Sequence, residues 1–101
     1  MSISAITHTA LSGMLAQSAR AGAIANNVAN AGTPGYGRLK TSFRSVEPSG
    51  VQTSVGETDQ SVDFAAELTE LIDTELSYKA NASVFETGAD LWDVLMSIKR
   101  D

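Results

Sequence analysis

The sequence contains no cysteine and a single histidine among its 101 residues. Without cysteine there can be no disulfide, no thiolate metal site and no cysteine nucleophile. His8 alone leaves little for a zinc site or for acid–base chemistry near neutral pH. A Ser/His/Asp arrangement is not evident, and no glycine-rich phosphate loop lies between a strand and a helix. We therefore expect no enzyme activity, no cofactor and no bound metal, and we assign no catalytic residue.

Charge is scarce and unevenly distributed. Charged residues make up 19% of the chain, and the net charge is −5. The first 60 residues carry four basic and three acidic side chains, whereas the remainder carries three basic and nine acidic ones. Nothing resembles a basic groove, so no nucleic-acid partner is expected. No apolar run approaches the length of a membrane span, and no Lys or Arg precedes the first apolar stretch, so we expect no cleavable secretory signal.

The segment from residue 4 to residue 30 lacks both proline and acidic residues and is rich in alanine. Alanine is the best helix former, so these residues predict one helix of about 27 residues. Asn30, Gly32 and Pro34 supply the usual signals for its end. Arg20 is the only fixed charge, and small residues occupy every face of the helix. This helix is expected either in the core of its own domain or surrounded by other subunits.

Both prolines and four glycines lie between residues 33 and 60. The composition predicts a turn at residues 33–35, followed by one or two short strands in the patches 38–43 and 51–55. A connection of about 28 residues is long for a compact domain, and such connections are usually functional or disordered in isolation.

The segment from residue 62 to residue 99 has the strongest pattern. Bulky residues recur at spacings of seven, and a second row lies between them, so a coiled-coil seam along one long helix is predicted. Ser61 or Asp63 is the expected N-cap, and Gly88 is a weak point that could allow a bend. The bulky row is Phe64, Leu71, Tyr78, Phe85 and Trp92, and the interleaved row is Leu68, Glu75, Ala82, Ala89 and Met96.

These segments predict an all-α domain of two long terminal helices, packed as a coiled-coil hairpin and joined by an extended or short-β linker. We divide it into the N-terminal helix (1–32), the linker (33–61) and the C-terminal helix (62–101). At 1.5 Å per residue the helices would be roughly 40 and 55 Å long, so the molecule should be elongated. The first helix has no polar face and the second is apolar outside its seam, so we expect an obligate assembly.

Two stretches carry a family resemblance. Residues 10–18 (ALSGMLAQS) and 24–36 (IANNVANAGTPGY) resemble the N-terminal signature of the bacterial flagellar axial proteins, which are rod, hook and hook-associated subunits. Residues 62–68, 78–82 and 87–90 resemble the C-terminal signature of the same family. Together the two signatures cover about two-thirds of the sequence, in the order the family has them. Larger members insert β domains between the signatures, so this chain resembles a minimal, rod-sized member.

The resemblance implies a structural subunit of the flagellar basal-body rod that polymerises helically around an export channel. Its expected partners are copies of itself, other axial proteins and the flagellar type III export apparatus, and its expected place is the periplasm-spanning rod. The alternatives are a hook-type axial or junction subunit, or a coiled-coil adaptor that caps the axial structure. The residues assigned to the subunit interface and the family motif are Leu11, Met14, Asn26, Asn27, Asn30, Thr33, Pro34, Gly35, Tyr36, Glu67, Leu71, Tyr78, Asn81, Phe85 and Trp92.

Several of these residues carry specific expectations. Asn26 and Asn30 share a face and could bond the 33–36 turn or a neighbouring subunit, or could simply cap the helix. Tyr78 shares a face with Asn81 and is expected either in the core or in a bond between subunits.

Charged residues carry three further expectations. Glu75 lies on the predicted seam and needs a partner, for which Arg20 is the candidate. His8 is expected to be exposed or to contact a partner. The acidic residues Asp63, Glu67, Glu70 and Asp73 are expected to form a solvated face at a capped helix start, with no closed loop of calcium ligands.

Overall fold

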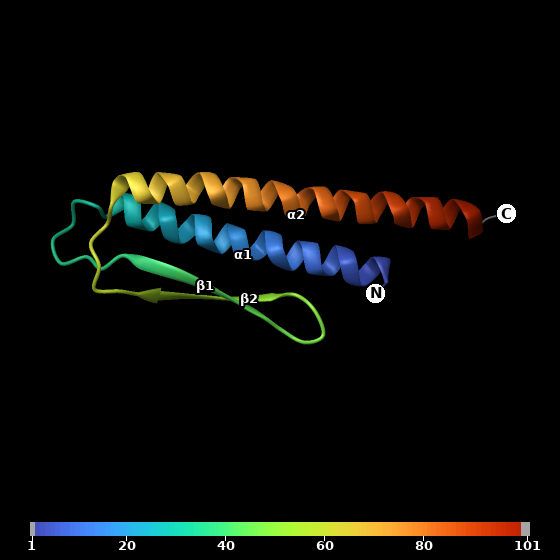
Figure 1. Ribbon diagram of the computed structural model, residues 1–101, viewed down its shortest axis with the longest axis horizontal. Helices are drawn as coiled ribbons and strands as arrows, with labels where there is room; N and C mark the ends of the chain where they lie inside the picture. Colours follow the sequence, from blue (N-terminus) through green and yellow to red (C-terminus); the bar gives the residue numbers. More distant parts are fainter. Residues whose placement is uncertain (1, 100–101) are drawn as a thin grey trace.

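The structure is a computed structural model, and it describes residues 2–99. The chain forms α1 (Ile3–Ala29), β1 (Leu39–Ser45), β2 (Val51–Glu57) and α2 (Phe64–Lys99). The two helices lie antiparallel and side by side, and the β-hairpin lies against α1, away from α2 (Figure 1). The molecule measures 66 × 24 × 14 Å and has a radius of gyration of 17.6 Å. A compact chain of this length would have a radius of about 13 Å, so the predicted elongation is confirmed.

Helix α1 agrees with the prediction to within one residue at each end. At its start, the Ser2 hydroxyl accepts a hydrogen bond from the backbone N–H of Ala5 at 3.1 Å. At its end, the N–H of Asn30 bonds to the carbonyl of Asn26, and the chain then turns through Gly35 with φ at +76°. Glycine is the residue that adopts this left-handed conformation without strain.

The linker forms a β-hairpin, which confirms the prediction of short strands. Strands β1 and β2 pair antiparallel, with Thr41 opposite Val55 and Phe43 opposite Thr53. Gly50, with φ at +110°, lies in the connection between them. Side chains alternate along a strand, so Leu39, Thr41 and Phe43 share one face with the residues opposite them.

Helix α2 begins after Asp63, whose carboxylate accepts a hydrogen bond from the N–H of Ala65 at 3.2 Å. Asp63 is therefore the N-cap, one of the two predicted residues. The helix runs through Gly88, which is buried. A Cβ added at Gly88 would overlap the methyl group of Thr7 on α1. Close approach of the two helices thus accounts for this glycine, which the sequence suggested only as a weak point.

The core between the helices is thin and made of small side chains. Ala10, Ala16, Ala23 and Ile24 of α1 are only 3–6% exposed. Small residues allow helix axes to approach closely, but they bury little apolar area each. Within residues 2–99 no helix is long and apolar enough to cross a membrane.

Candidate assembly interface

A buried asparagine joins three segments at the closed end of the helical hairpin. The Asn27 side chain is 1% exposed. Its Nδ2 donates to the carbonyl of Leu39 at 3.0 Å and to Oε1 of Glu67 at 3.2 Å. Its Oδ1 accepts from the N–H of Leu39 at 2.7 Å and from the Tyr36 hydroxyl at 2.9 Å. The amide thus uses two donors and two acceptor positions, its full capacity, and ties α1 to both β1 and α2.

A buried ion pair adjoins this amide. Arg38 Nε donates to Glu67 Oε1 at 2.5 Å, and Arg38 Nη2 donates to Glu70 Oε2 at 2.6 Å. The Glu67 side chain is fully buried, and that of Arg38 is 17% exposed. The hydrogen bond that Arg38 donates to Glu67 is the largest cause of a pKa of Arg38 above its ordinary value. Burying two charges is costly unless they are paired, and a buried pair adds little net stability. The main effect of this ion pair is therefore to fix the position of the β-hairpin at the point where β1 begins, which we call the hairpin root.

Arg20, in the middle of α1, also contacts the acidic start of α2, where it shares Glu70 with Arg38. It pairs with Asp73 at 3.0 Å and with Glu70 at 3.5 Å. The predicted contact between Arg20 and Glu75 is therefore wrong: Glu75 is exposed and pairs with Lys79 on its own helix at 3.0 Å. The physical reason is the rotation of α2, which turns Glu75 toward solvent. The acidic start of α2 is also less solvated than predicted, because Glu67 is buried.

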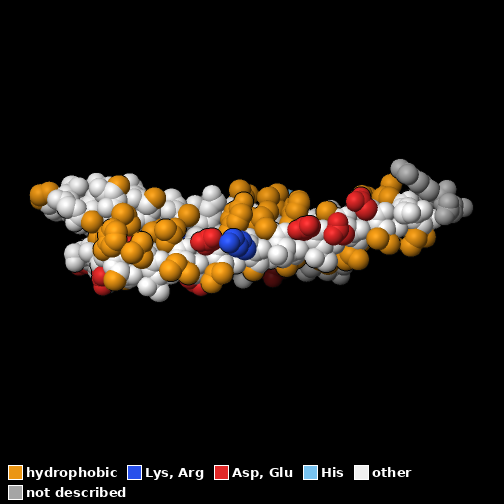
Figure 2. All heavy atoms as spheres, turned by 90° about the horizontal axis from the view of Figure 1, so that it is seen from above, with side chains coloured by type: hydrophobic (Ala, Val, Ile, Leu, Met, Phe, Trp, Pro, Cys, Tyr) orange, Lys and Arg blue, Asp and Glu red, His pale blue; other side chains and the backbone are white. Residues whose placement is uncertain are grey.

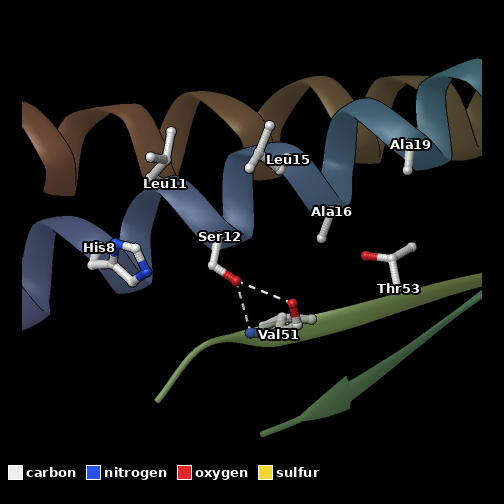
Figure 3. A pocket seen from close by; sticks show the side chains of 8 residues that line it. All are labelled: His8, Leu11, Ser12, Leu15, Ala16, Ala19, Val51 and Thr53. Atoms are coloured by element: carbon white, nitrogen blue, oxygen red, sulfur yellow. Dashed lines mark hydrogen bonds between the residues drawn. The ribbon is translucent and has the colours of Figure 1, made fainter. Parts of the chain in front are cut away.

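Farther along α1, the adjacent residues Ser12 and Gly13 determine how β2 and α2 lie against this helix. The Ser12 hydroxyl accepts from the N–H of Val51 at 2.8 Å and donates to the carbonyl of Val51 at 3.0 Å. Beside it, a Cβ added at Gly13 would lie 2.5 Å from Oδ1 of Asn81 on α2. Ser12 therefore anchors the start of β2, and Gly13 gives α2 its close approach. A hollow of about 430 Å³ lies around Ser12 between α1 and β2, and Leu15 and Thr53 also line it (Figure 3).

The predicted seam of α2 is wrong in its rotation. The side that faces α1 is a row of polar or small residues, which we call the central row: Glu67, Thr74, Asn81 and Gly88. Glu67 and Thr74 are 0% and 2% exposed. The bulky row, in contrast, is 38–55% exposed. Both rows have the same seven-residue period, so periodicity alone could not distinguish them. The small core of α1 and its polar partners at Asn27 and Arg20 select the central row.

Large apolar side chains consequently cover much of α2 without a partner among the described residues. Tyr78 is 43% exposed and Trp92 is 52% exposed, where the sequence suggested burial in the seam. Viewed from the α2 side, hydrophobic side chains extend along the length of the molecule, with acidic ones between them (Figure 2). Contiguous exposed apolar surface on this scale is typical of interaction sites. Further apolar residues exposed on α2 are Leu68, Ile72, Leu76, Val84, Leu91, Val94, Leu95, Met96 and Ile98.

The residues predicted for the site divide into two groups. Asn27, Tyr36 and Glu67 come together in the polar cluster around Asn27, which we call the junction. At the same end of α1, the Asn30 side chain bonds the carbonyl of Asn26 and the Thr33 hydroxyl. The Asn30 contacts cap α1 and reach the 33–36 turn within the chain. The second group lies along the helices outside the junction: Leu11, Met14, Leu71, Tyr78, Asn81, Phe85 and Trp92. Asn26, Pro34 and Gly35 are exposed at the closed end, and His8 is exposed, as predicted.

Three residues important to the geometry were not singled out from the sequence as site residues: Ser12, Gly13 and Arg38. Ser12 and Gly13 belong to a predicted motif, but a serine in a helix gives no sign that it holds a strand 39 residues away. Arg38 offered a clearer signal. It is one of only four basic residues in the first 60, and the acidic residues of α2 needed a cation.

This architecture defines an elongated helical-hairpin subunit with unburied apolar rows. The family model described as flagella basal body rod protein matches residues 8–36. The flagellar hook protein FlgE of Brucella suis is 48% identical over 42 residues, which make up 42% of this chain and 11% of that protein. FlgE of Rhizobium meliloti is 49% identical over 39 residues, or 39% of this chain and 10% of that protein. The matched segments thus span about a tenth of the length of these relatives.

These matches support the flagellar rod and axial family, and the range of the family model contains the N-terminal motifs from which the resemblance was inferred. The matched range of the family model contains Ser12, Gly13, Asn27 and Tyr36. In this structure those residues hold the hairpin and α2 onto α1. The segment that the family model matches therefore includes most of α1, the helix that lies between the β-hairpin and α2.

Proposed function

We propose that this chain is a non-catalytic structural subunit of the flagellar basal-body rod. In this proposal it polymerises helically, through its terminal helices, with copies of itself and with other axial proteins. It would reach the periplasm-spanning rod through the flagellar type III export apparatus. The rod family model and the hook-protein relatives both support an axial role, and the short connection between the two helices, with only one β-hairpin, is what favours the rod in this proposal.

The observation that carries this proposal is the large accessible surface of the chain, to which exposed apolar residues of α2 contribute. The accessible surface of the described chain is 6915 Å². A compact monomer of 10.6 kDa would expose about 5500 Å². The difference is comparable to the area that a standard protein interface buries, about 1600 Å² in total. The bulky row of α2 accounts for part of this difference in area. We therefore infer that neighbouring molecules in an assembly cover this surface.

A basal-body preparation tests the proposal directly. An antibody against the chain should detect it in purified basal bodies, including rod particles from cells that lack the hook protein. A hook-type subunit would be missing from those rod particles, and an adaptor would be found in the soluble cytoplasmic fraction. Either result would overturn the assignment to the rod.

Circular dichroism combined with sedimentation gives a second test on the purified chain. Because one copy cannot bury the apolar rows of α2, helicity should be low in dilute solution and should rise as large species form. A chain that is fully helical and of constant small size at every concentration would instead favour the adaptor.

A further inference from the structure

The β-hairpin has a free edge on each side, because its sheet consists of β1 and β2 alone. In an antiparallel pair, alternate residues of a strand point their backbone N–H and C=O groups at the partner strand, and the residues between them point these groups outward. The bond from the N–H of Thr58 to the carbonyl of Arg38 fixes this alternation. The odd-numbered residues of β1, from Leu39 to Ser45, therefore turn their backbone groups to the free edge.

Helix α1 satisfies one residue on each edge as a further strand would. The Asn27 amide accepts from the N–H of Leu39 and donates to its carbonyl. The Ser12 hydroxyl bonds both backbone groups of Val51 on β2 in the same way. Because Ser12 lies at the free edge of β2, β1 lies on the side of β2 away from α1 at this end of the hairpin (Figure 3).

Three successive edge residues of β1 stay open: Thr41, Phe43 and Ser45. Each offers an N–H and a C=O group, and within residues 2–99 these groups have no bonding partner. Strand β1 contacts β2 and α1 but not α2, so the second helix does not cover this edge. The Phe43 side chain, which shares a face of the sheet with Thr41, is 42% exposed. An open strand edge of this kind is a template for pairing with another strand.

Two cations lie beside the open edge. Lys40 and Arg44 project from the opposite face of β1, four positions and about 13 Å apart. Both are exposed, and neither forms an ion pair within residues 2–99. Arg44 bonds only the side-chain amide of Gln52. A hollow of about 400 Å³ beside Arg44 and Ser42 leaves room there for a side chain of an added strand.

The same cations disfavour a second copy as the added strand. Two β1 strands paired antiparallel through their edges, centred on Ser42, would place Lys40 of one copy opposite Arg44 of the other. Like charges directly opposite each other destabilise a strand pair, whereas acidic side chains at these positions stabilise it. Lys40 and Arg44 would lie in non-hydrogen-bonded pairs with the added strand, where side chains approach most closely.

We propose that β1 binds an extended acidic segment of another protein as a third, antiparallel strand. This segment carries two acidic residues four positions apart, opposite Lys40 and Arg44, and apolar residues on its other face beside Phe43. Asn27 already occupies the edge at Leu39, so the docked segment is short. The inference concerns the hairpin and not the apolar rows of α2, and it is independent of the assignment to the rod.

A synthetic peptide tests this contact. The probe has nine residues that alternate threonine with valine, with glutamate at the third and seventh positions and a fluorescent label at its N-terminus. Its anisotropy is titrated with the full chain at concentrations where circular dichroism shows that the helices have formed. Replacing both glutamates by lysine should weaken binding at least about tenfold. N-methylation of the three valines that face the open edge should weaken it by a similar factor, because the backbone bonds are lost.

Variants of the chain locate the contact. The double variant Lys40→Glu with Arg44→Glu should reverse the preference, so that the lysine peptide binds at least about tenfold more tightly than the glutamate peptide. Lys79→Glu is the matched control, because this exposed lysine lies on α2, and it should keep the preference of the wild type. Ser45→Pro removes one outward N–H without removing a bond to β2 and should weaken binding about fivefold. Circular dichroism shows whether each variant still folds.

Hydrogen exchange identifies the edge that the peptide occupies. The amides of Thr41, Phe43 and Ser45 should exchange more slowly when the glutamate peptide is bound, while that of Val55, on the open edge of β2, should not change. Absence of binding, equal affinity for the glutamate and lysine peptides, or protection at Val55 instead overturns the proposal. Protection of the β1 edge without peptide that rises with the concentration of the chain also overturns it, because a second copy then occupies this edge.

Discussion

The two ends of the helical hairpin hold their layers together in different ways. At the closed end, Asn27 and Arg38 both donate to Oε1 of Glu67, and the three side chains are largely or fully buried, while Oε2 of Glu67 is buried without a hydrogen-bond partner. At the open end the contact of Thr7 with Gly88 is tight but small, and the surrounding side chains, such as Trp92, are half exposed. The closed end therefore determines the register of the layers within the chain, whereas the open end and the outer faces of α2 leave large apolar side chains exposed.

Arg38→Ala should give the largest loss of stability at the closed end. It leaves the carboxylate of Glu67 fully buried without its cation, which typically costs about 3–5 kcal/mol in the free energy of unfolding. Urea denaturation at a concentration where the chain is assembled, followed by circular dichroism, measures this change. Arg44→Ala removes an arginine from the exposed part of β1, the strand that follows Arg38, and should change stability by no more than about 0.5 kcal/mol. Equal effects of the two variants would show that the ion pair does not fix the hairpin root.

Asn27→Ala should follow in size. It leaves the backbone N–H and carbonyl of Leu39 and the Tyr36 hydroxyl without their partner, at a cost of about 2–3 kcal/mol. Asn26→Ala, next to it in the sequence but exposed, should cost less than about 0.5 kcal/mol. The same urea titration compares them. An Asn26 variant that loses stability as Asn27→Ala does would contradict the assignment of the junction to Asn27.

Glycine substitutions compare the tight contact at the open end with an open position on the same molecule. Gly88→Ala places a Cβ against the Thr7 methyl and should cost about 1–2 kcal/mol. A Cβ added at Gly22, on α1, meets no atom within 4 Å, so Gly22→Ala should stabilise the chain by about 0.5–1 kcal/mol. Thermal unfolding of the two variants should shift in opposite directions. Shifts of the same sign would mean that Gly88 is not needed for helix approach.

The sequence predicted the elements but not the rotation of α2. Alanine content, the Asn30 and Pro34 signals and the heptad pattern were sufficient for both helices, and the two extended patches became β1 and β2. The predicted seam was wrong because a heptad pattern defines several rows of residues that share one seven-residue period. The row with the bulkiest side chains was taken as the buried one. In a subunit with unburied surface, the bulkiest row can be the one turned outward. The partners of Arg20, Arg38 and Asn27 on α2 lie 29 to 53 residues away in the sequence, and such pairings depend on the tertiary register.

Ser12→Ala should give the smallest effect and should act locally. It removes both hydrogen bonds between the Ser12 hydroxyl and the backbone of Val51. The expected loss is about 0.5–1.5 kcal/mol, because Ser12 and Val51 are only partly buried and water can replace the hydroxyl. Hydrogen exchange should therefore increase at the start of β2, while the amides of Leu39 and its neighbours, held by Asn27, keep their protection. Faster exchange at both places would mean that the hairpin lifts from α1 as one unit, and that the two anchors, 15 positions apart on α1, do not act independently.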